Sequence, residues 1–172
     1  MFEIRKQPVV SSEKPIRHFQ RGLEYESNQV HLWLLSHKDT TAGFLVYLLQ
    51  DKKMIVHLRP PLVDLGPEVR NLASTEKVRN EAVFIVHRFR KMGGMKLLLS
   101  ELFEEALRTN IKEIQVTDIT ENWLVKKMTD LLLASGYDQI HQVYPQEGEG
   151  SISLIARRGG DNQVLPNLKS SN

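Results

Sequence analysis

The chain contains no cysteine among its 172 residues. Disulfide bonds, thiolate nucleophiles and cysteine-based zinc sites are therefore excluded. The chain also lacks an apolar run long enough to span a membrane, and its first ten residues, MFEIRKQPVV, lack the apolar core of a signal peptide. From these absences we expect a cytoplasmic protein with no membrane partner.

The chain has almost no excess of charge of either sign. Lysine and arginine together number 23 and the acidic residues number 21, which leaves a net charge of +2. Binding to nucleic acid over a broad surface needs a larger or better segregated positive field, so nucleic acid is not an expected partner. The histidines at positions 18, 31, 37, 57 and 141 show no spacing typical of metal ligands. We interpret them as surface or edge residues and expect no metal.

The spacing of apolar residues predicts strands and helices within one domain. A hydrophobic content of 41% is enough for one globular core, expected over residues 1–158, and residues 159–172 are expected to be a polar tail. The patterns predict strands at 1–5, 30–36, 42–50, 54–58, 81–87 and 112–118, helices at 12–22, 93–109 and 121–135, and a closing hairpin around the turn PQEGEG. The strands 30–36 and 42–50 should pair as an antiparallel hairpin across the turn HKDTT.

Short signals mark the ends of these helices and one long interruption. Asn110 is expected to stop the second helix in a left-handed conformation, Thr120 to cap the third helix and Gly136 to end it. Between residues 59 and 80, Pro-Pro and Gly-Pro pairs break the pattern, with a short helix predicted at 67–72. A connection of this length inside a compact domain is typical of a functional or partner-ordered segment.

The most informative stretch is VFIVHRFRKMGGMKLLL, which covers residues 83–99. An apolar, β-branched run leads to three basic residues, Arg88, Arg90 and Lys91, and then to a Gly-Gly pair and a leucine-rich helix. The amides of the first helical turn have no partner within the helix, and the helix dipole adds positive potential there. A strand that turns through glycines into a helix N-terminus is therefore a candidate site for a phosphate-bearing ligand. The alternative is that Gly93-Gly94 only ends the strand and starts the helix.

Further motifs occur in a defined order along the chain. Val86-His87 precedes the basic turn, the turn reads Arg-Lys-Met-Gly-Gly-Met from Arg90 to Met95, and the phrase NIKEIQVTDITEN is followed by a helix and ASGY. This order resembles the GCN5-related N-acetyltransferase (GNAT) family, whose fourth strand runs into a Q/R-x-x-G-x-G/A loop that binds the pyrophosphate of acetyl-CoA. The resemblance covers residues 30–158, apart from the insertion at 59–80. It implies an α/β fold of the acyl-CoA N-acyltransferase type, with a central mixed sheet flanked by helices.

The resemblance also implies acetyl-CoA as co-substrate and a primary amine as acceptor. It places the cofactor-binding residues at Val86, Arg90, Lys91, Met92, Gly93, Gly94, Met95 and Asn122. Acetyl transfer needs, in addition, a base for the amine, a donor to the thioester oxygen and an acid for the departing thiolate. Glu81 and His87, at the two ends of the fourth strand, are the candidate catalytic bases. Alternatively, Glu81 is a solvated strand end and His87 a polar residue beside the loop.

Two positions depart from the family pattern. Met95 stands where the family has glycine or alanine, so its side chain either crowds the phosphates or turns into the core. Leu132 stands where the family has a tyrosine acid, four residues before the glycine of ASGY, and leucine cannot donate a proton. Tyr137 is expected in the core rather than as a relocated acid. Trp33 and Trp123 are expected to pack against other side chains rather than to stack on a substrate.

These observations support two functional hypotheses, between which the fold alone does not choose. The first is a GNAT-like acetyltransferase that moves an acetyl group from acetyl-CoA to a primary amine. The second is a catalytically degenerate GNAT-like subunit of a larger assembly, such as a virion component of a tailed phage, located in the host cytoplasm or the virion. Protein partners, or a second copy of the chain in a homo-oligomer, would then bind through residues 59–80 and 159–172.

Overall fold

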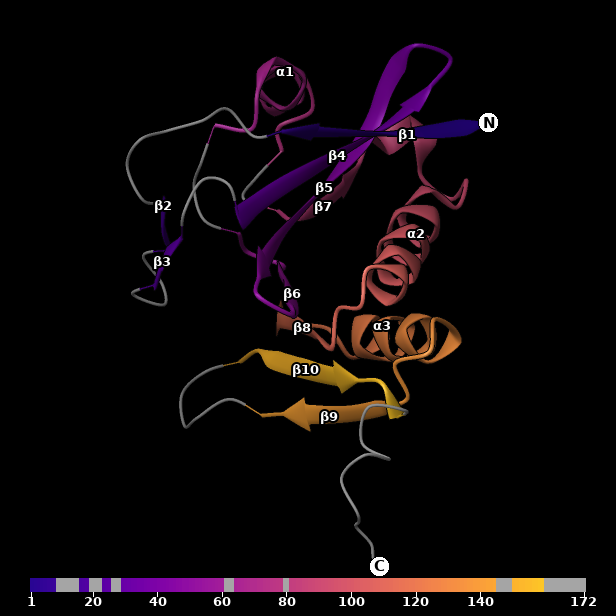
Figure 1. The fold of residues 1–172 in the computed structure, drawn as a ribbon. Helices are drawn as coiled ribbons and strands as arrows, with labels where there is room; N and C mark the ends of the chain where they lie inside the picture. Colours follow the sequence, from indigo (N-terminus) through magenta and orange to yellow (C-terminus); the bar gives the residue numbers. More distant parts are fainter. Residues whose placement is uncertain are drawn as a thin grey trace, which may run out of the picture.

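The fold is a long mixed β-sheet with helices packed against it (Figure 1). The computed structural model describes residues 1–8, 16–18, 23–25, 29–60, 64–78, 81–144 and 150–159. Helices α2 (Gly94–Arg108) and α3 (Asn122–Ala134) lie together beside the sheet, and α1 (Pro67–Thr75) lies near the end that contains β1 (Phe2–Pro8). The expected α/β class, a mixed sheet flanked by helices, is confirmed.

The strands follow the order β1-β4-β5-β6-β8-β10-β9 across the sheet, and β7 also pairs with β5. Their bounds are β4 Val30–His37, β5 Thr40–Gln50, β6 Lys53–His57, β7 Val83–Ile85, β8 Glu113–Ile119, β9 Gln139–Val143 and β10 Ile152–Arg157. Paired strands are antiparallel except β6 and β8, which are parallel from Lys53↔Glu113 to His57↔Thr117. The strands predicted from residue 30 onward and the closing hairpin of β9 and β10 are confirmed.

The predicted hairpin of residues 30–36 and 42–50 is formed by β4 and β5. Lys38 and Asp39 make the turn, with φ of 47° and 67°. Two consecutive positive φ values are typical of a type I′ turn, whose twist matches that of the paired strands. This tight turn sets the register between β4 and β5, and the other strands of the sheet pair outward on either side of these two.

One edge of β5 is shared by two strands that are far apart in the sequence. Residues 53–55 of β6 pair with β5, and residues 83–85 of β7 continue along the same edge. The chain leaves the sheet after β6 and returns where the amide of Ala82 donates to the oxygen of Leu58 at 3.4 Å. β6 and β7 therefore occupy the same position beside β5, one after the other, and the insertion at 59–80 separates them in the sequence. Only β6 is paired with β8 on its other side.

Helices α2 and α3 cover an apolar face of the sheet. Leu98, Leu99, Leu102 and Ala106 form an apolar stripe on α2 and are fully buried, whereas Met95 is only partly buried. Each fully buried leucine contributes about 1.5–3 kcal/mol relative to an exposed one. Burial of this stripe, rather than helix propensity, holds α2 in a fixed position beside β7.

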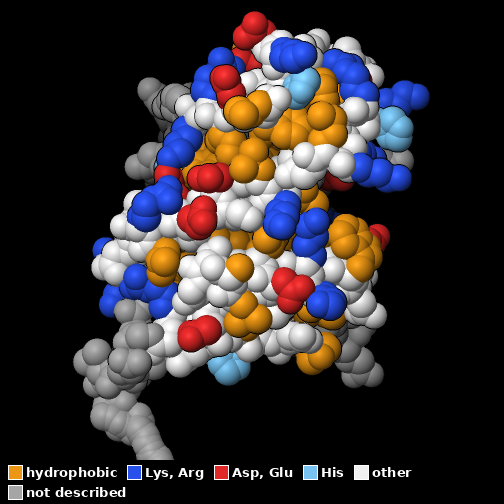
Figure 2. Space-filling model, turned by 90° about the vertical axis from the view of Figure 1, so that its right-hand side faces the viewer, with side chains coloured by type: hydrophobic (Ala, Val, Ile, Leu, Met, Phe, Trp, Pro, Cys, Tyr) orange, Lys and Arg blue, Asp and Glu red, His pale blue; other side chains and the backbone are white. Residues whose placement is uncertain are grey.

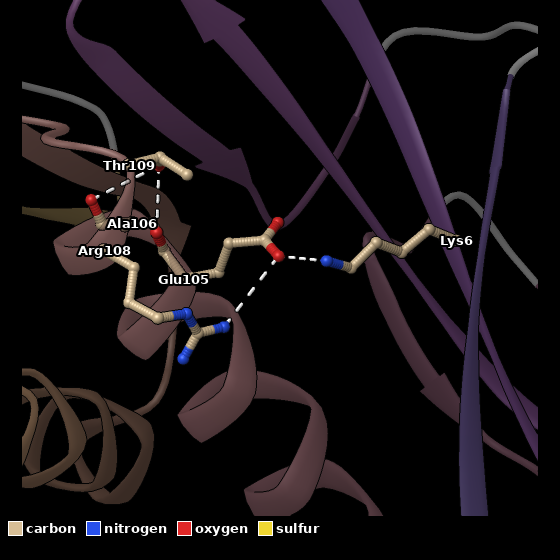
Figure 3. Close-up of polar contacts among 5 residues, drawn as sticks. All are labelled: Lys6, Glu105, Ala106, Arg108 and Thr109. Carbon is tan, nitrogen blue, oxygen red and sulfur yellow. Dashed lines mark hydrogen bonds and ion pairs between the residues drawn. The ribbon is translucent and has the colours of Figure 1, made fainter.

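Helix α1 lies on the opposite face of the sheet from α2. Neighbouring residues of a strand point to opposite faces, and Arg5 pairs with Glu68 of α1 at 2.9 Å, whereas Lys6 pairs with Glu105 of α2 (Figure 3). Leu72 of α1 is buried in the core cluster. The short helix predicted within the insertion is thus confirmed as α1, and it packs on the sheet of its own chain.

The N-terminal helix predicted at 12–22 is wrong. Residues Ile16–His18 form β2 and pair with β3, Leu23–Tyr25, in a separate two-stranded sheet. An isolated helix of this length is marginal in water, so cross-strand pairing overrides the local pattern. The polar tail beyond residue 159 and residues 145–149 of the PQEGEG turn lie outside the described residues.

Two further expectations need correction. His57 was expected at the surface or an edge, but it is 4% exposed because β6 lies between β5 and β8 in the sheet. The N-cap of α3 is Glu121 rather than Thr120, because the Glu121 oxygen accepts the helical hydrogen bond from Val125 at 3.3 Å. The predicted helix ends at Asn110 and Gly136 are confirmed, with φ of 61° and 100°.

Candidate functional site

A cleft of about 610 Å³ opens between β7, the glycine turn and the N-terminal ends of α2 and α3. Its walls include Glu81, Arg90, Lys96 and Trp123. Figure 2 shows it as a notch between two halves of the molecule, with Lys and Arg side chains gathered around it. The cleft opens because the two strands beside β5 differ in their second neighbour. β6 pairs with β8, whereas β7 pairs with β5 alone and leaves a space on its other side.

The outer edge of β7 presents backbone groups to this cleft. At the two ends of the strand, Ala82 accepts a hydrogen bond from β5 at 2.7 Å and Val86 donates one to β5 at 2.8 Å. Hydrogen-bonded residues alternate along an antiparallel ladder, so Val83 and Ile85 direct their N–H and C=O groups away from β5. An extended ligand with amide groups can pair with such an edge as an added strand does.

Two glycines begin α2, and each meets a different steric requirement. Gly93 has a φ of 84°, which other residues rarely adopt, and a Cβ there would meet no atom within 4 Å. A Cβ on Gly94 would instead come within 2.9 Å of Leu35 and 3.3 Å of Ile85. Backbone conformation requires the first glycine and close packing on the sheet requires the second.

The first turn of α2 offers unpaired amides to the cleft. The first intrahelical hydrogen bond runs from the amide of Leu97 to the oxygen of Gly93 at 2.9 Å, so the amides of the three preceding residues have no acceptor within the helix. Among the described residues no side chain caps α2, and its first turn contains no acidic side chain. These donors and the helix dipole together favour an anion at this position.

Basic side chains outnumber acidic ones around the cleft: Arg90, Lys91, Lys96 and Lys127 line it together with Glu81 and Glu121. The guanidinium of Arg90 is held against β7, because its Nε donates to the Ile85 oxygen at 2.9 Å. The guanidinium carbon also lies 5.6 Å from the centre of the Phe84 ring. A guanidinium fixed in this way keeps further N–H donors that suit a phosphate group.

The structure brings five of the predicted cofactor-binding residues to the cleft, namely Arg90, Lys91, Gly93, Gly94 and Met95. Met95 is partly buried and packs against the core while one side borders the cleft. Met92 is 51% exposed on the turn, and Val86 is 2% exposed with its amide bonded to Ala42. Asn122 lines a separate surface hollow with Lys126 and Tyr144.

The two candidate bases lie in different places. Glu81 borders the cleft, whereas His87 is exposed and begins a single 3₁₀ turn, His87–Phe89, after the strand. Leu132 is fully buried, and the Tyr137 hydroxyl is buried and donates to the oxygen of Ile111 at 2.6 Å. Tyr137 is therefore a core residue, as expected, and neither side chain supplies an acid to the cleft.

Sequence reasoning missed Trp123 as a residue of the site. Its side chain is 58% exposed, lines the cleft, and donates its Nε1–H to the carboxylate of Glu121. A tryptophan in the first turn of an amphipathic helix can face the core or the solvent, so the spacing alone does not decide. Trp33, by contrast, packs in the core as expected.

Other perturbed groups lie outside the cleft. Burial and then the nearby Glu105 carboxylate raise the pKa of Tyr47 to about 12. Burial lowers the pKa of His31, whose ring stacks on that of Tyr47. Within the described residues, no cluster of His, Asp and Glu could hold a metal ion, and no helix has the length and apolar content to cross a membrane.

Solved structures similar to this chain include GNAT-family acetyltransferases, at 9–14% sequence identity. One is the ribosomal-protein-S18-alanine N-acetyltransferase of Escherichia coli (9% identity, 100% of each chain, TM-score 0.49). Another is the IAA acetyltransferase of Bacillus cereus (14% identity, 91% of this chain and 99% of the other, TM-score 0.48). A third is a Bacillus subtilis acetyltransferase in complex with CoA (12% identity, 75% and 77%, TM-score 0.44).

No family model and no curated protein sequence matches the chain. At these identities and TM-scores, the likeness to solved structures concerns the fold alone, and it carries no argument about what the cleft binds.

Proposed function

We propose that the chain is an acetyl-CoA-dependent N-acetyltransferase that acts on a primary amine. The observation that carries this proposal is that three features face one cleft: the first-turn amides of α2, the fixed guanidinium of Arg90 and the outer edge of β7. Helix amides and cations suit a pyrophosphate, and a strand edge suits the amide-bearing pantetheine arm. The loop from Arg90 to Met95 is also the part of the sequence that most resembles the GNAT pattern.

The charge of the cleft and its exposed backbone groups support acetyl-CoA as the ligand. The pyrophosphate would lie at the amides of Gly94, Met95 and Lys96, with Arg90 and Lys91 beside it. The pantetheine arm would follow the edge of β7 toward the place where β6 and β8 remain paired. Because Met95 packs against the core, its side chain is compatible with an open loop. Bound acetyl-CoA would supply the activated thioester, while the chain orients it and excludes water.

A second candidate function is binding of acetyl-CoA without acetyl transfer. This candidate is favoured because neither Leu132 nor Tyr137 can supply an acid for the departing thiolate. Leu132 is apolar, and the buried hydroxyl of Tyr137 donates to the oxygen of Ile111. A degenerate subunit of a larger assembly, such as a virion component, would be one form of this candidate. Nothing in the described part of the chain adds support for the assembly itself.

Calorimetric titration of the full chain with acetyl-CoA tests the binding. We expect micromolar affinity, and Arg90→Ala should weaken it about tenfold, or about 1.4 kcal/mol. Arg88→Ala is the matched control, since the Arg88 guanidinium lies over the Phe89 ring at 4.8 Å and does not belong to the cleft wall. Absence of binding at millimolar acetyl-CoA overturns both candidate functions.

Release of free CoA thiol in the presence of primary amines separates the two candidates. Tyramine, spermidine and a peptide with a free α-amine are suitable probes, because they differ in charge and size while each presents a primary amine. Amine-dependent release supports the transferase. Binding without release supports the second candidate.

A further inference from the structure

A bulge at the end of β8 leads the chain into the part of the cleft wall that α3 provides. The register between β10 and β8 shifts between Ile152 and Leu154, so β8 carries an extra residue there, and Asp118 has a φ of 65°. Within the bulge, the hydroxyl of Thr117 donates to Oδ2 of Asp118 at 3.2 Å. Helix α3 begins just after the bulge, and its first turn borders the cleft.

This wall carries an exposed tryptophan next to a lysine. Trp123 and Lys127 both line the cleft and lie one turn apart on α3, so their side chains are neighbours on one face of the helix. A long helical side chain leans toward the N-terminus of its helix, which directs Lys127 toward the turn that carries Trp123. The wall therefore offers an aromatic ring and an ammonium group side by side.

The indole of Trp123 is held in one orientation although its side chain is 58% exposed. Its Nε1–H donates to the carboxylate of Glu121. This hydrogen bond engages the edge of the ring, and the indole makes no contact with another aromatic ring of the described residues. A flat ligand that stacks on a ring fixed in this way immobilises little additional side-chain freedom.

The lysines of the cleft differ from a neighbouring lysine in having no carboxylate partner. Lys127 is half-buried, and neither it nor Lys96 of α2 forms an ion pair among the described residues. Lys126 is exposed and borders the separate hollow, and its Nζ lies 3.1 Å from Oδ2 of Asp130. Charged groups that are partly buried are normally paired, so the two lysines of the cleft favour an anionic ligand.

The proposed ligand carries negative charge beyond its pyrophosphate. CoA has a phosphate on the 3′ carbon of its ribose, and such a phosphate monoester carries about 1.5–2 negative charges at pH 7. Arg90 and Lys91 lie beside the proposed place of the pyrophosphate, which leaves Lys96 and Lys127 for this second group. The same ribose carries adenine, a flat base of the kind that stacks on aromatic side chains.

We propose that Trp123, Lys96 and Lys127 form a subsite for the 3′-phosphorylated adenosine of CoA. Adenine stacks on the indole, and the ammonium groups of the two lysines bind the 3′-phosphate. This proposal rests on the proposed binding of acetyl-CoA, and it assigns a role in recognition to a tryptophan that sequence reasoning had expected only to pack. The subsite selects CoA thioesters over dephospho-CoA thioesters and takes no part in acetyl transfer itself.

Calorimetric titration of the full chain with acetyl-CoA and with acetyl-dephospho-CoA tests the phosphate contact. The two ligands differ only in the 3′-phosphate, and we expect the second to bind about tenfold more weakly. Lys127→Ala should weaken acetyl-CoA about fivefold and leave acetyl-dephospho-CoA unchanged. Lys126→Ala is the matched control, because it removes a charge from the same helix outside the cleft wall. Equal affinities of the parent chain for the two ligands overturn the proposal.

Two variants of Trp123 test the stacking of adenine. Trp123→Ala should bind acetyl-CoA about tenfold more weakly than the parent chain, and Trp123→Phe should bind it more tightly than Trp123→Ala. Both variants lose the hydrogen bond to Glu121, so the difference between them measures the aromatic ring alone. Equal affinities of the two variants overturn the stacking.

Tryptophan fluorescence locates the adenine directly. The chain contains two tryptophans, and Trp33 is 2% exposed, so a base stacked in the cleft can quench only Trp123. We expect 3′-phosphoadenosine 5′-phosphate to quench the parent chain and acetyl-pantetheine, which has no base, to leave it unchanged. Quenching by the nucleotide should be absent in Trp123→Phe. Quenching that persists in this variant overturns the stacking on Trp123.

The failure of this inference can be told apart from the failure of the proposed function. If the parent chain does not bind acetyl-CoA, the proposed function and the subsite are both overturned. If it binds acetyl-CoA and acetyl-dephospho-CoA equally well, the subsite alone is overturned. If it prefers acetyl-CoA and Lys127→Ala removes most of that preference, the subsite is supported, whether or not the chain acetylates an amine.

Discussion

The turn after β7 and the bulge in β8 lie on two sides of the same separation of strands, and both depend on residues with positive φ. In the turn, Lys91 and Gly93 have φ of 65° and 84°, and the chain then exposes the amides of a helix N-terminus. In the bulge, Asp118 has a φ of 65°, and two neighbouring side chains come together on one side. The first irregularity leaves main-chain amides at the start of a helix, where we propose that an anion binds, and the second brings two polar side chains into contact.

This difference teaches where each region is sensitive to substitution. Main-chain amides are present whatever the side chains are, so the turn should tolerate changes that keep its backbone conformation and its packing. The side-chain contact in the bulge needs a polar group on both residues, so it should be lost when a single polar atom is removed. The following predictions test that contrast.

The largest effect on stability is expected from Gly94→Val. Its side chain would collide with Leu35 and Ile85, which lie 2.9 Å and 3.3 Å from the position of a Cβ. Overpacking of this kind costs about 2–3 kcal/mol of unfolding free energy, measured by urea denaturation. Gly93→Ala, at a position with open space, should cost about 1 kcal/mol through its backbone conformation alone. Equal losses in the two variants would contradict the separate roles of the two glycines.

A smaller loss is expected at the bulge from Asp118→Val. A β-branched side chain in left-handed backbone and the lost hydrogen bond to Thr117 should together cost about 1–2 kcal/mol. Asp118→Asn tolerates the same backbone and keeps an acceptor oxygen, so it should stay within about 0.5 kcal/mol of the parent. Thermal unfolding of the pair measures the difference, and a stable Asp118→Val would show that the bulge is not strained.

The next effect concerns ligand affinity rather than stability. Arg90→Lys keeps the positive charge but loses the planar donors, including the Nε that bonds to Ile85 at 2.9 Å. We expect acetyl-CoA to bind about fivefold more weakly, or about 1 kcal/mol, with the unfolding free energy unchanged within about 0.5 kcal/mol. Calorimetry and urea denaturation of the same sample measure both quantities. Full affinity in this variant would show that charge alone holds the ligand.

The smallest effect is expected at the opposite end of β8, at Glu113. Burial raises the pKa of this carboxyl, but hydrogen bonds from Gln115 and Arg157 and the charges of Arg157 and Lys53 outweigh it and hold the pKa below the usual value. A carboxyl whose pKa is lower in the folded chain than in the unfolded chain stabilises the fold at pH values above the unfolded pKa of about 4.3. This stabilisation is lost as the pH falls through the pKa of the folded chain.

The comparison of the parent chain with Glu113→Gln measures this contribution. At pH 7 the parent should be about 1 kcal/mol more stable, and at about pH 2.5 the difference should be close to zero. Urea denaturation at the two pH values gives both free energies. If the difference in unfolding free energy between the two chains does not change with pH, the ion pairs of the Glu113 carboxylate contribute nothing to stability.

The glycine turn was predictable from the sequence because each of its signals is local. An apolar run, a cluster of basic residues, two glycines and a leucine stripe follow one another within 17 residues, 83–99, and each acts on its immediate neighbours. The helix ends at Asn110 and Gly136 were predictable for the same reason. The roles of Val86 and Asn122 in binding remain predictions of the resemblance, and the structure places neither in the wall of the cleft.

The bulge was not predictable in this way. Thr117 and Asp118 belong to the segment KEIQVTD, which has the pattern of an ordinary strand and carries no sign of an extra residue. His57 lies 60 positions before Thr117, and a shift of one residue in the β6–β8 register would turn their side chains to opposite faces. Trp123 shows the same limit, because helical spacing alone did not decide which way it faces.

By itself, the sequence determined the type of most elements, the glycine turn and the excess of basic residues beside it, since these depend on backbone preferences and on charge. Only the tertiary structure decided that β6 and β7 pair one after the other with the same edge of β5, that a cleft opens beside β7, and that His57 contacts Thr117. The physical reason is that strand pairing joins residues far apart in the chain, and its register is settled by the packing of the whole sheet rather than by any local pattern.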